Sequence, residues 1–207
     1  MAHMQQNRFI GFVKEVLPEY FSGMRCLEVG SLDINGSART FFDECDYIGI
    51  DVALGRGVDQ ACKGENFPGE ANSFDVVISC ECMEHNPGYE KTWLNMIRLL
   101  KDDGLMVMTC ATLGRRQHGT RKSDPRSSPL TLQMGQDYYK NLAADDFRFV
   151  NLDRFFSRHA FFTDCSHADL LFFGLGRSAS LDAQQRFDER LQGLIDFYQK
   201  IAVDGEF

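Results

Sequence analysis

The sequence contains few prolines, has fewer basic than acidic residues and lacks any long apolar segment. Five prolines among 207 residues, against 18 phenylalanines, argue against extensive disorder. The 22 basic residues are outnumbered by 30 acidic ones, and the net charge of -8 makes binding to nucleic-acid phosphates unlikely to be the general function. No apolar run approaches the roughly 20 residues that a membrane-spanning helix needs, so we expect a soluble protein without a membrane partner.

A disulfide framework is also missing. The seven cysteines are odd in number and follow no regular spacing, which predicts reduced, mostly buried thiols and a cytoplasmic location. Cys80, Cys82 and His85 could together bind zinc, but a second ligand pair at a usual spacing is missing. The sequence therefore predicts no metal ligands.

Strand-like and helix-like segments alternate over the first half of the chain. The pattern predicts helices over residues 7–21, 37–42 and 89–100, and strands over residues 25–30, 46–51, 57–62, 73–80 and 105–110. Residues 101–104 are expected to form the turn that ends the third helix. This alternation predicts an α/β fold with right-handed βαβ units and a doubly wound, Rossmann-like, mostly parallel sheet.

The C-terminal part of the chain follows a different pattern. Residues 145–156 predict a helix, and residues 187–198 predict a final one. The strand-like residues 159–165 and 168–177 are too close together for a parallel crossover, so they should form an antiparallel hairpin. We expect residues 5–207 to form a single domain.

Residues 111–137 form a long segment with few large apolar residues. It is basic within an acidic chain, through Arg115, Arg116, Arg121, Lys122 and Arg126. Loops of this length are usually either functional or disordered. Two interpretations remain open here: a mobile, solvated excursion, and a lid that closes over an anionic group.

Polar and glycine residues gather where the first two predicted strands end. Gly30 follows the first strand, Gly36 and Ser37 open the next helical segment, and Asp51 ends the second strand. In a doubly wound sheet, ligands bind beyond the carboxyl ends of the strands, where a carboxylate can bind both ribose hydroxyls. The pattern predicts a nucleoside-containing cofactor.

The loop spacing separates two such cofactors. A nicotinamide dinucleotide favours G-x-G-x-x-G, whereas here the next glycine after Gly30 is Gly36. Glu28 would also repel a pyrophosphate. A carboxylate at this place suits a ligand with an ammonium and a sulfonium group. S-adenosylmethionine is therefore favoured over a nicotinamide dinucleotide as the cofactor, which disfavours a nicotinamide-dependent oxidoreductase.

Four segments then carry a resemblance to a known family: "LEVG", "YIGID", "ENFPGEANSFDVVISCECMEH" and "NMIRLLKDDGLMVMT". The chain resembles class I S-adenosylmethionine-dependent methyltransferases, close to the type-11 small-molecule group. The resemblance implies a cofactor site formed by Glu28, Gly30, Ser31, Gly36, Asp51, Val52, Gly64, Glu65, Cys80 and Glu81. In it, Glu28 would hold the amino end of methionine, Asp51 the ribose hydroxyls and Val52 the adenine, while Cys80 and Glu81 would border the methionine.

The sequence departs from the family pattern in two places. The loop after Gly30 is longer than usual, which leaves the roles of Asp33 and Asn35 open. Lys63 and Gly64 stand where the family often has an acidic residue that meets the adenine amino group, so Glu65 or a backbone carbonyl would have to replace it.

The acceptor side is less defined. We expect methyl transfer to the oxygen or nitrogen of a small, anionic molecule, with S-adenosylhomocysteine as product. His85 and His118 are the first and second candidates for the catalytic base. Arg115, Arg116 and Tyr138 are candidates for acceptor binding, although core packing is the alternative for Tyr138. A non-catalytic cofactor-binding or partner-binding module is the alternative function, a protein or RNA methyltransferase is less favoured, and the oligomeric state is not predicted.

Overall fold

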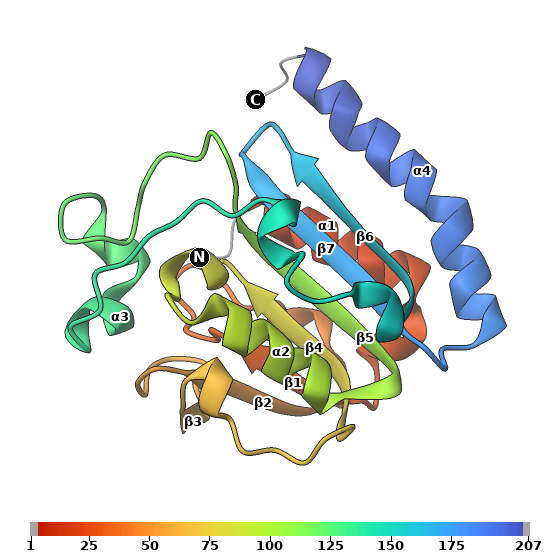
Figure 1. The fold of residues 1–207 in the computed structure, drawn as a ribbon, viewed down its shortest axis with the longest axis horizontal. Coiled ribbons are helices and arrows are strands. Elements are labelled where there is room, and N and C mark those ends of the chain that lie inside the picture. Colours follow the sequence, from red (N-terminus) through yellow and green to blue (C-terminus); the bar gives the residue numbers. More distant parts are fainter. Residues whose placement is uncertain (1–3, 205–207) are drawn as a thin grey trace.

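The computed structural model describes residues 4–204, with the side chains of residues 4–198, and is built around one seven-stranded sheet (Figure 1). The strand order is β3-β2-β1-β4-β5-β7-β6. The strands are β1 (Arg25–Val29), β2 (Asp46–Asp51), β3 (Gln60–Ala61), β4 (Phe74–Cys80), β5 (Leu100–Ala111), β6 (Phe156–Asp164) and β7 (Asp169–Gly176). Strands β1 to β5 run parallel, and β7 pairs antiparallel with both β5 and β6. The predicted doubly wound sheet with a C-terminal hairpin is confirmed.

Helices cover both faces of the sheet because its central strands are apolar on both sides. On one face, α1 (Met4–Val16) and α4 (Leu181–Asp204) pack with Phe9 and Phe187 against alternate residues of β4, β5 and β7. On the other face, α2 (Tyr89–Leu99) inserts the fully buried Trp93, and residues 142–156 complete the layer. Figure 1 shows α2 in front of the sheet and α1 behind it.

The helix predicted over residues 145–156 is wrong. Two short 3₁₀ turns, Ala144–Phe147 and Leu152–Arg154, stand in its place, and Phe156 already begins β6. Phe147 and Leu152 are both buried against the α2 face of the sheet. Their burial satisfies the apolar pattern without a continuous helix, which shows that tertiary packing outweighed the local periodicity.

Smaller differences occur at other predicted elements. Residues 37–42 contain only the 3₁₀ turn Ala38–Phe41, and β3 is two residues long. The first helix ends at Val16, before Pro18, whose ring cannot continue a helix. Residues 101–104, predicted as a turn, already belong to β5, whose pairing with β4 shifts register between Phe74 and Val76.

None of the helices within residues 4–204 combines the length and the apolar character that a bilayer span requires.

Candidate active site

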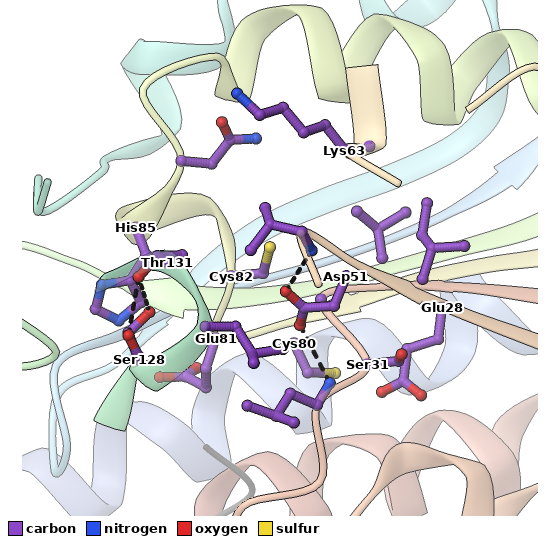
Figure 2. Close-up of a pocket in the computed structure, with 18 of the residues that line it drawn as sticks. Glu28, Ser31, Asp51, Lys63, Cys80, Glu81, Cys82, His85, Ser128 and Thr131 are labelled. Atoms are coloured by element: carbon purple, nitrogen blue, oxygen red, sulfur yellow. Dashed lines mark hydrogen bonds between the residues drawn. The ribbon is translucent and has the colours of Figure 1, made fainter. Parts of the chain in front are cut away.

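A pocket that is partly open to solvent lies beyond the carboxyl ends of β1, β2 and β4. Its walls come from these three strand ends, from residues 62–65 after β3, from Gln6 of α1 and from the loop between β5 and β6. In Figure 2, Glu28 and Asp51 lie toward one side, and His85 lies with Ser128 and Thr131 toward the other. All ten residues predicted for the cofactor line this pocket: Glu28, Gly30, Ser31, Gly36, Asp51, Val52, Gly64, Glu65, Cys80 and Glu81.

Asp51 is held by two backbone amides at the end of β2. Its Oδ1 accepts the N–H of Val52 at 2.7 Å, and its Oδ2 accepts the N–H of Leu32 at 3.2 Å (Figure 2). Burial raises the pKa of this carboxyl, and the two backbone hydrogen bonds oppose the rise. Each oxygen keeps a lone pair for a further donor, so the group is positioned to bind two neighbouring hydroxyls.

Glu28 brings a buried carboxylate into the pocket from β1. The residue is 4% exposed, and its Oε2 accepts the hydroxyl of Tyr47 at 3.0 Å. Burial raises the pKa of Glu28 to about 7, while the Tyr47 hydrogen bond and the charge of Arg39 lower it. A carboxylate with so little compensation favours a cationic ligand, which would stabilise its ionised form.

Gly30 is required by the neighbouring strand end. Its φ is +83°, and a Cβ at this position would lie 2.5 Å from the Cβ of Cys82. The sequence suggests close approach of a ligand at this glycine, but contact between the ends of β1 and β4 already requires it.

The lengthened loop after Gly30 is closed by Asp33. Its Oδ1 accepts the N–H of Gly36 at 2.8 Å, and its Oδ2 pairs with Arg56 at 2.9 Å. The structure thus gives Asp33 a role in shaping the loop that the sequence left open. The residues that this loop contributes to the pocket are Ser31, Leu32, Ile34 and Gly36.

Gly64 and Glu65 contact the N-terminal half of α2. A Cβ on Gly64 would lie 2.6 Å from Thr92 Cγ2, and the Glu65 carboxylate accepts the hydroxyl of Thr92 at 3.1 Å. Lys63 also lines the pocket, where the family often has an acidic residue. Glu65 also lines the pocket, and its Oε2 accepts the Thr92 hydroxyl of α2.

The end of β4 carries an unusual backbone conformation. Glu81 has a φ of +50°, is 6% exposed, and accepts the hydroxyl of Thr109 at 2.9 Å through Oε1. Left-handed backbone at a non-glycine residue is uncommon and tends to occur at functional sites. Cys80 precedes it, and burial raises the pKa of its thiol well above the usual value.

The two predicted catalytic histidines come together, although they lie on different elements. His85 ends the 3₁₀ turn Met83–His85 after β4, and His118 lies in the loop after β5, with ring centroids 5.0 Å apart. Tyr139 packs against both rings. Burial, then the charge of His118, lower the pKa of His85 to about 3, and burial also lowers the pKa of His118.

Glu84 adds a buried carboxylate to this ring cluster. It is 0% exposed, and burial together with the charge of Glu81 raises its pKa to about 8. The backbone groups of Glu84 and Ala111 oppose this rise. His85 lines the pocket, whereas His118 lies behind it and faces Glu84.

The predicted acceptor residues are placed differently. Arg115 pairs with the buried Asp169 at 2.8 Å and donates to the His167 carbonyl at 2.8 Å, so its guanidinium anchors the loop to β7. Arg116 is exposed, and Tyr138 is half-buried beside the ring cluster. Among the described residues that line the pocket, neither arginine nor Tyr138 is present. Their role in acceptor binding stays a prediction.

Several pocket residues escaped the sequence analysis. Ser127, Ser128, Leu130, Thr131 and Gln136 reach the pocket from the turn Pro125–Ser127, from α3 (Pro129–Gln133) and from the segment after it. The Ser128–Pro129 pair was a signal for the start of α3, because proline favours the first helical turn and serine the position before it. Contact of this segment with the pocket had no local signal.

The pocket fits S-adenosylmethionine in this structure. The buried Glu28 suits the ammonium group, and Asp51 offers two oriented oxygens for the ribose hydroxyls.

Comparisons with known proteins agree with this fit. Residues 28–108 match the methyltransferase domain family. No protein with a curated description matches the chain significantly. Many solved structures share its fold.

Three similar structures illustrate that likeness. A chain of the Haloferax volcanii complex between the Trm112 methyltransferase activator and a methyltransferase is 13% identical, with a TM-score of 0.53, covering 83% of this chain and 92% of that one. Burkholderia thailandensis 1,6-didemethyltoxoflavin-N1-methyltransferase, with its substrate and S-adenosylhomocysteine, is 13% identical, with a TM-score of 0.53 and coverages of 82% and 76%. Haemonchus contortus phosphoethanolamine N-methyltransferase 2, with S-adenosylmethionine, is 19% identical, with a TM-score of 0.54 and coverages of 96% and 46%.

Identities this low show a shared fold only, so the family assignment rests on the domain match and on the residues of the pocket. All ten predicted cofactor residues lie within the matched range and line the pocket. The domain match and the pocket residues together support an S-adenosylmethionine-dependent methyltransferase with the class I fold.

Proposed function

We propose that this methyltransferase acts on the oxygen or nitrogen of a small, anionic acceptor. The observation that carries the proposal is the enclosure of the pocket by residues 127–136, which places the buried Ser127 and Ser128 across from the strand ends. A protein or nucleic-acid acceptor could reach the pocket only if residues 127–136 moved away from it.

The cofactor supplies an electrophilic methyl group on its sulfonium. Glu28 and Asp51 would hold it at its amino and ribose ends, and Gly30, Ser31 and Gly36 would line the path between them. Because a sulfonium is already a good leaving group, alignment of the acceptor and exclusion of water account for much of the catalysis.

The acceptor would enter beside His85, at the opposite side of the pocket from Glu28 (Figure 2). A pKa of about 3 makes the His85 imidazole neutral and a weak base. His118 is less buried, with 14% of its side chain exposed, but it lies behind the pocket, so His85 is the histidine that an acceptor would contact.

The anionic character of the acceptor is supported by the loop over residues 111–137, which we take to be a lid. Arg116, Arg121, Lys122 and Arg126 are exposed on it, whereas Arg115 is paired with Asp169. A related fold binds an acceptor of this class: the Haemonchus contortus enzyme was solved with phosphomonomethylethanolamine. We also take the chain to be one cytoplasmic domain over residues 5–207, of which residues 205–207 lie outside the described part.

The test is calorimetric titration with S-adenosylmethionine and S-adenosylhomocysteine, followed by an acceptor panel of matched anionic and neutral hydroxyl and amine compounds. Turnover that favours the anionic members supports the proposal, and Arg116→Ala should then raise the acceptor KM. Equal turnover of the neutral compounds would contradict the proposal that the acceptor is anionic. Cofactor binding without turnover on any acceptor would instead favour the non-catalytic module.

A further inference from the structure

Three side chains that could ligate a metal converge next to the pocket. Glu84 and His85 lie on the 3₁₀ turn that follows β4, and His118 lies on the loop that follows β5. One ligand atom from each of them falls within 4.8 Å of the other two. Within the part of the chain that the structure describes, these three are the histidine, cysteine or acidic residues that lie close enough together to share a metal ion.

Three buried ligand atoms of the cluster make no well-formed hydrogen bond to a described residue. Both carboxylate oxygens of Glu84 and Nδ1 of His85 are in this state, although Glu84 is 0% exposed. Buried polar groups in native proteins are nearly always paired, and a carboxylate without a partner is especially costly. A cation between these atoms would satisfy all three.

The orientation of His118 also suits ligation. Its Nδ1 lies 3.2 Å from the carbonyl oxygen of Arg116, which assigns the proton to that nitrogen. Its Nε2 then carries the free lone pair, and it faces Glu84 Oε1 at 4.0 Å. A backbone carbonyl that fixes one imidazole nitrogen is the usual arrangement behind a metal-ligating histidine.

The donor set selects the class of ion. Two imidazoles and one carboxylate suit Mn²⁺, Fe²⁺, Co²⁺ or Zn²⁺ better than Ca²⁺, which prefers oxygen ligands only. Ligand atoms at about 2.0–2.2 Å from an ion lie no more than roughly 4.4 Å apart, so a small side-chain rotation closes the cluster. The 14% exposure of the His118 side chain leaves a route for the ion to enter.

We propose that Glu84, His85 and His118 form a binding site for a divalent transition-metal ion beside the acceptor end of the pocket. The site differs from the zinc trio of Cys80, Cys82 and His85 that the sequence suggested, because His118 comes from a distant loop. If the proposed function holds, an ion here lies next to His85, which lines the pocket, and would position an acceptor oxygen.

The direct test is titration of the metal-free full chain with Mn²⁺, followed by electron paramagnetic resonance of the free ion. We expect one equivalent to bind, and we expect Glu84→Gln and His118→Ala each to weaken binding at least tenfold. Matched controls are Glu70→Gln, at an exposed glutamate, and His159→Ala, at a histidine that pairs with the exposed Asp153. Unchanged Mn²⁺ affinity in both cluster variants, or no binding by the wild type, would overturn the proposal.

Thermal unfolding provides a second readout that separates ligation from a structural role. At 100-fold excess over Kd, Mn²⁺ should raise the Tm of the wild type by about 5–10 °C and leave that of Glu84→Gln unchanged. An equal rise of Tm with Mn²⁺ in the wild type and in Glu84→Gln would contradict the proposal.

Failure of the metal site and failure of the proposed function give different results. The metal site alone is overturned if the wild type does not bind Mn²⁺ but still binds S-adenosylhomocysteine and methylates an acceptor at full rate after chelation. Wild type that binds Mn²⁺ but neither cofactor nor acceptor keeps the metal site and overturns the function. Methylation lost on chelation and restored by Mn²⁺, but not restored in His118→Ala, supports both.

Discussion

Asp51 is the residue on which we expect cofactor binding to depend most directly, since its oxygens are fixed by the amides of Leu32 and Val52. We expect Asp51→Ala to weaken S-adenosylhomocysteine binding by about 10- to 100-fold, because hydrogen bonds to a charged group contribute about 1.5–3 kcal/mol. Calorimetry measures this change directly. Asp59→Ala, at an exposed aspartate in the next turn, is the matched control, and equal losses in both variants would contradict the assigned role.

Glu28 should make cofactor binding depend on pH. Its pKa of about 7 means that the carboxyl is largely protonated at pH 6 and ionised at pH 8. The groups around it are Tyr47, Arg39 and Asp51. Because the ligand's ammonium requires the ionised form, affinity for S-adenosylhomocysteine should rise as pH increases from 5.5 to 7.5. Titrations of Glu28→Gln over the same range should be weaker and flat, and a slope that survives in this variant would assign the effect to another group.

The same group should lower stability as pH rises. The pKa of Glu28 is higher in the folded state than its ordinary value of 4.5, so the folded state binds more protons between these two values. The favourable contribution is therefore complete below about pH 4.5 and is lost as pH rises through about 7. Ligand-free Glu28→Gln should then have a higher Tm than the wild type at pH 8, and a smaller difference at pH 5.

At the scale of elements, the approach of the loop after β5 to the turn after β4 depends on Gly119. Its φ is +64°, and a Cβ would lie 2.4 Å from His85 Cε1. Gly119→Ala should therefore push His118 away from Glu84, lower Mn²⁺ affinity and reduce stability by about 1–3 kcal/mol.

Gly135 offers a matched control for this substitution. Its φ is also positive, at +79°, but nothing lies within 4 Å of a Cβ at that position. Gly135→Ala carries the left-handed strain without the collision. If urea unfolding and Mn²⁺ titration gave equal losses for both variants, the contact with His85 would not be the cause.

For the whole molecule, ligand binding and the basic loop should be coupled. Ser127, Ser128 and Leu130 line the pocket, while Arg121, Lys122 and Arg126 are exposed beside them. S-adenosylhomocysteine should slow tryptic cleavage after these three basic residues, because a ligand in the pocket would contact the segment that must open for the protease. Mass spectrometry of the fragments measures the rate at each site.

The variant Asp51→Ala serves as control for the digestion, because it keeps the loop but binds the ligand weakly. Protection in the wild type that is absent from this variant supports a lid that responds to the cofactor. Cleavage at the same rate with and without ligand would favour the mobile, solvated excursion that the sequence also allowed.

Much of the fold and of the cofactor site followed from local sequence. Apolar, β-branched runs ended at Gly30, Asp51 and Cys80, and parallel strands bring such ends to one edge of the sheet. The positions of Asp51 and Glu28 therefore needed no knowledge of distant contacts. The helix expected over residues 145–156 failed because Phe147 and Leu152 meet the sheet from 3₁₀ turns, which a helical periodicity cannot distinguish from a helix.

The sequence by itself determined the α/β order of elements, the cofactor class and the carboxylates at the strand ends, because each depends on spacing within a few residues or on strand direction. Only the tertiary structure decided that His118 faces Glu84, that Ser128 closes the pocket and that Arg115 anchors the loop to β7. Those contacts join segments tens of residues apart, and no local pattern encodes which of many exposed polar residues will meet. Their burial and pairing emerge only when the loop packs against the finished sheet.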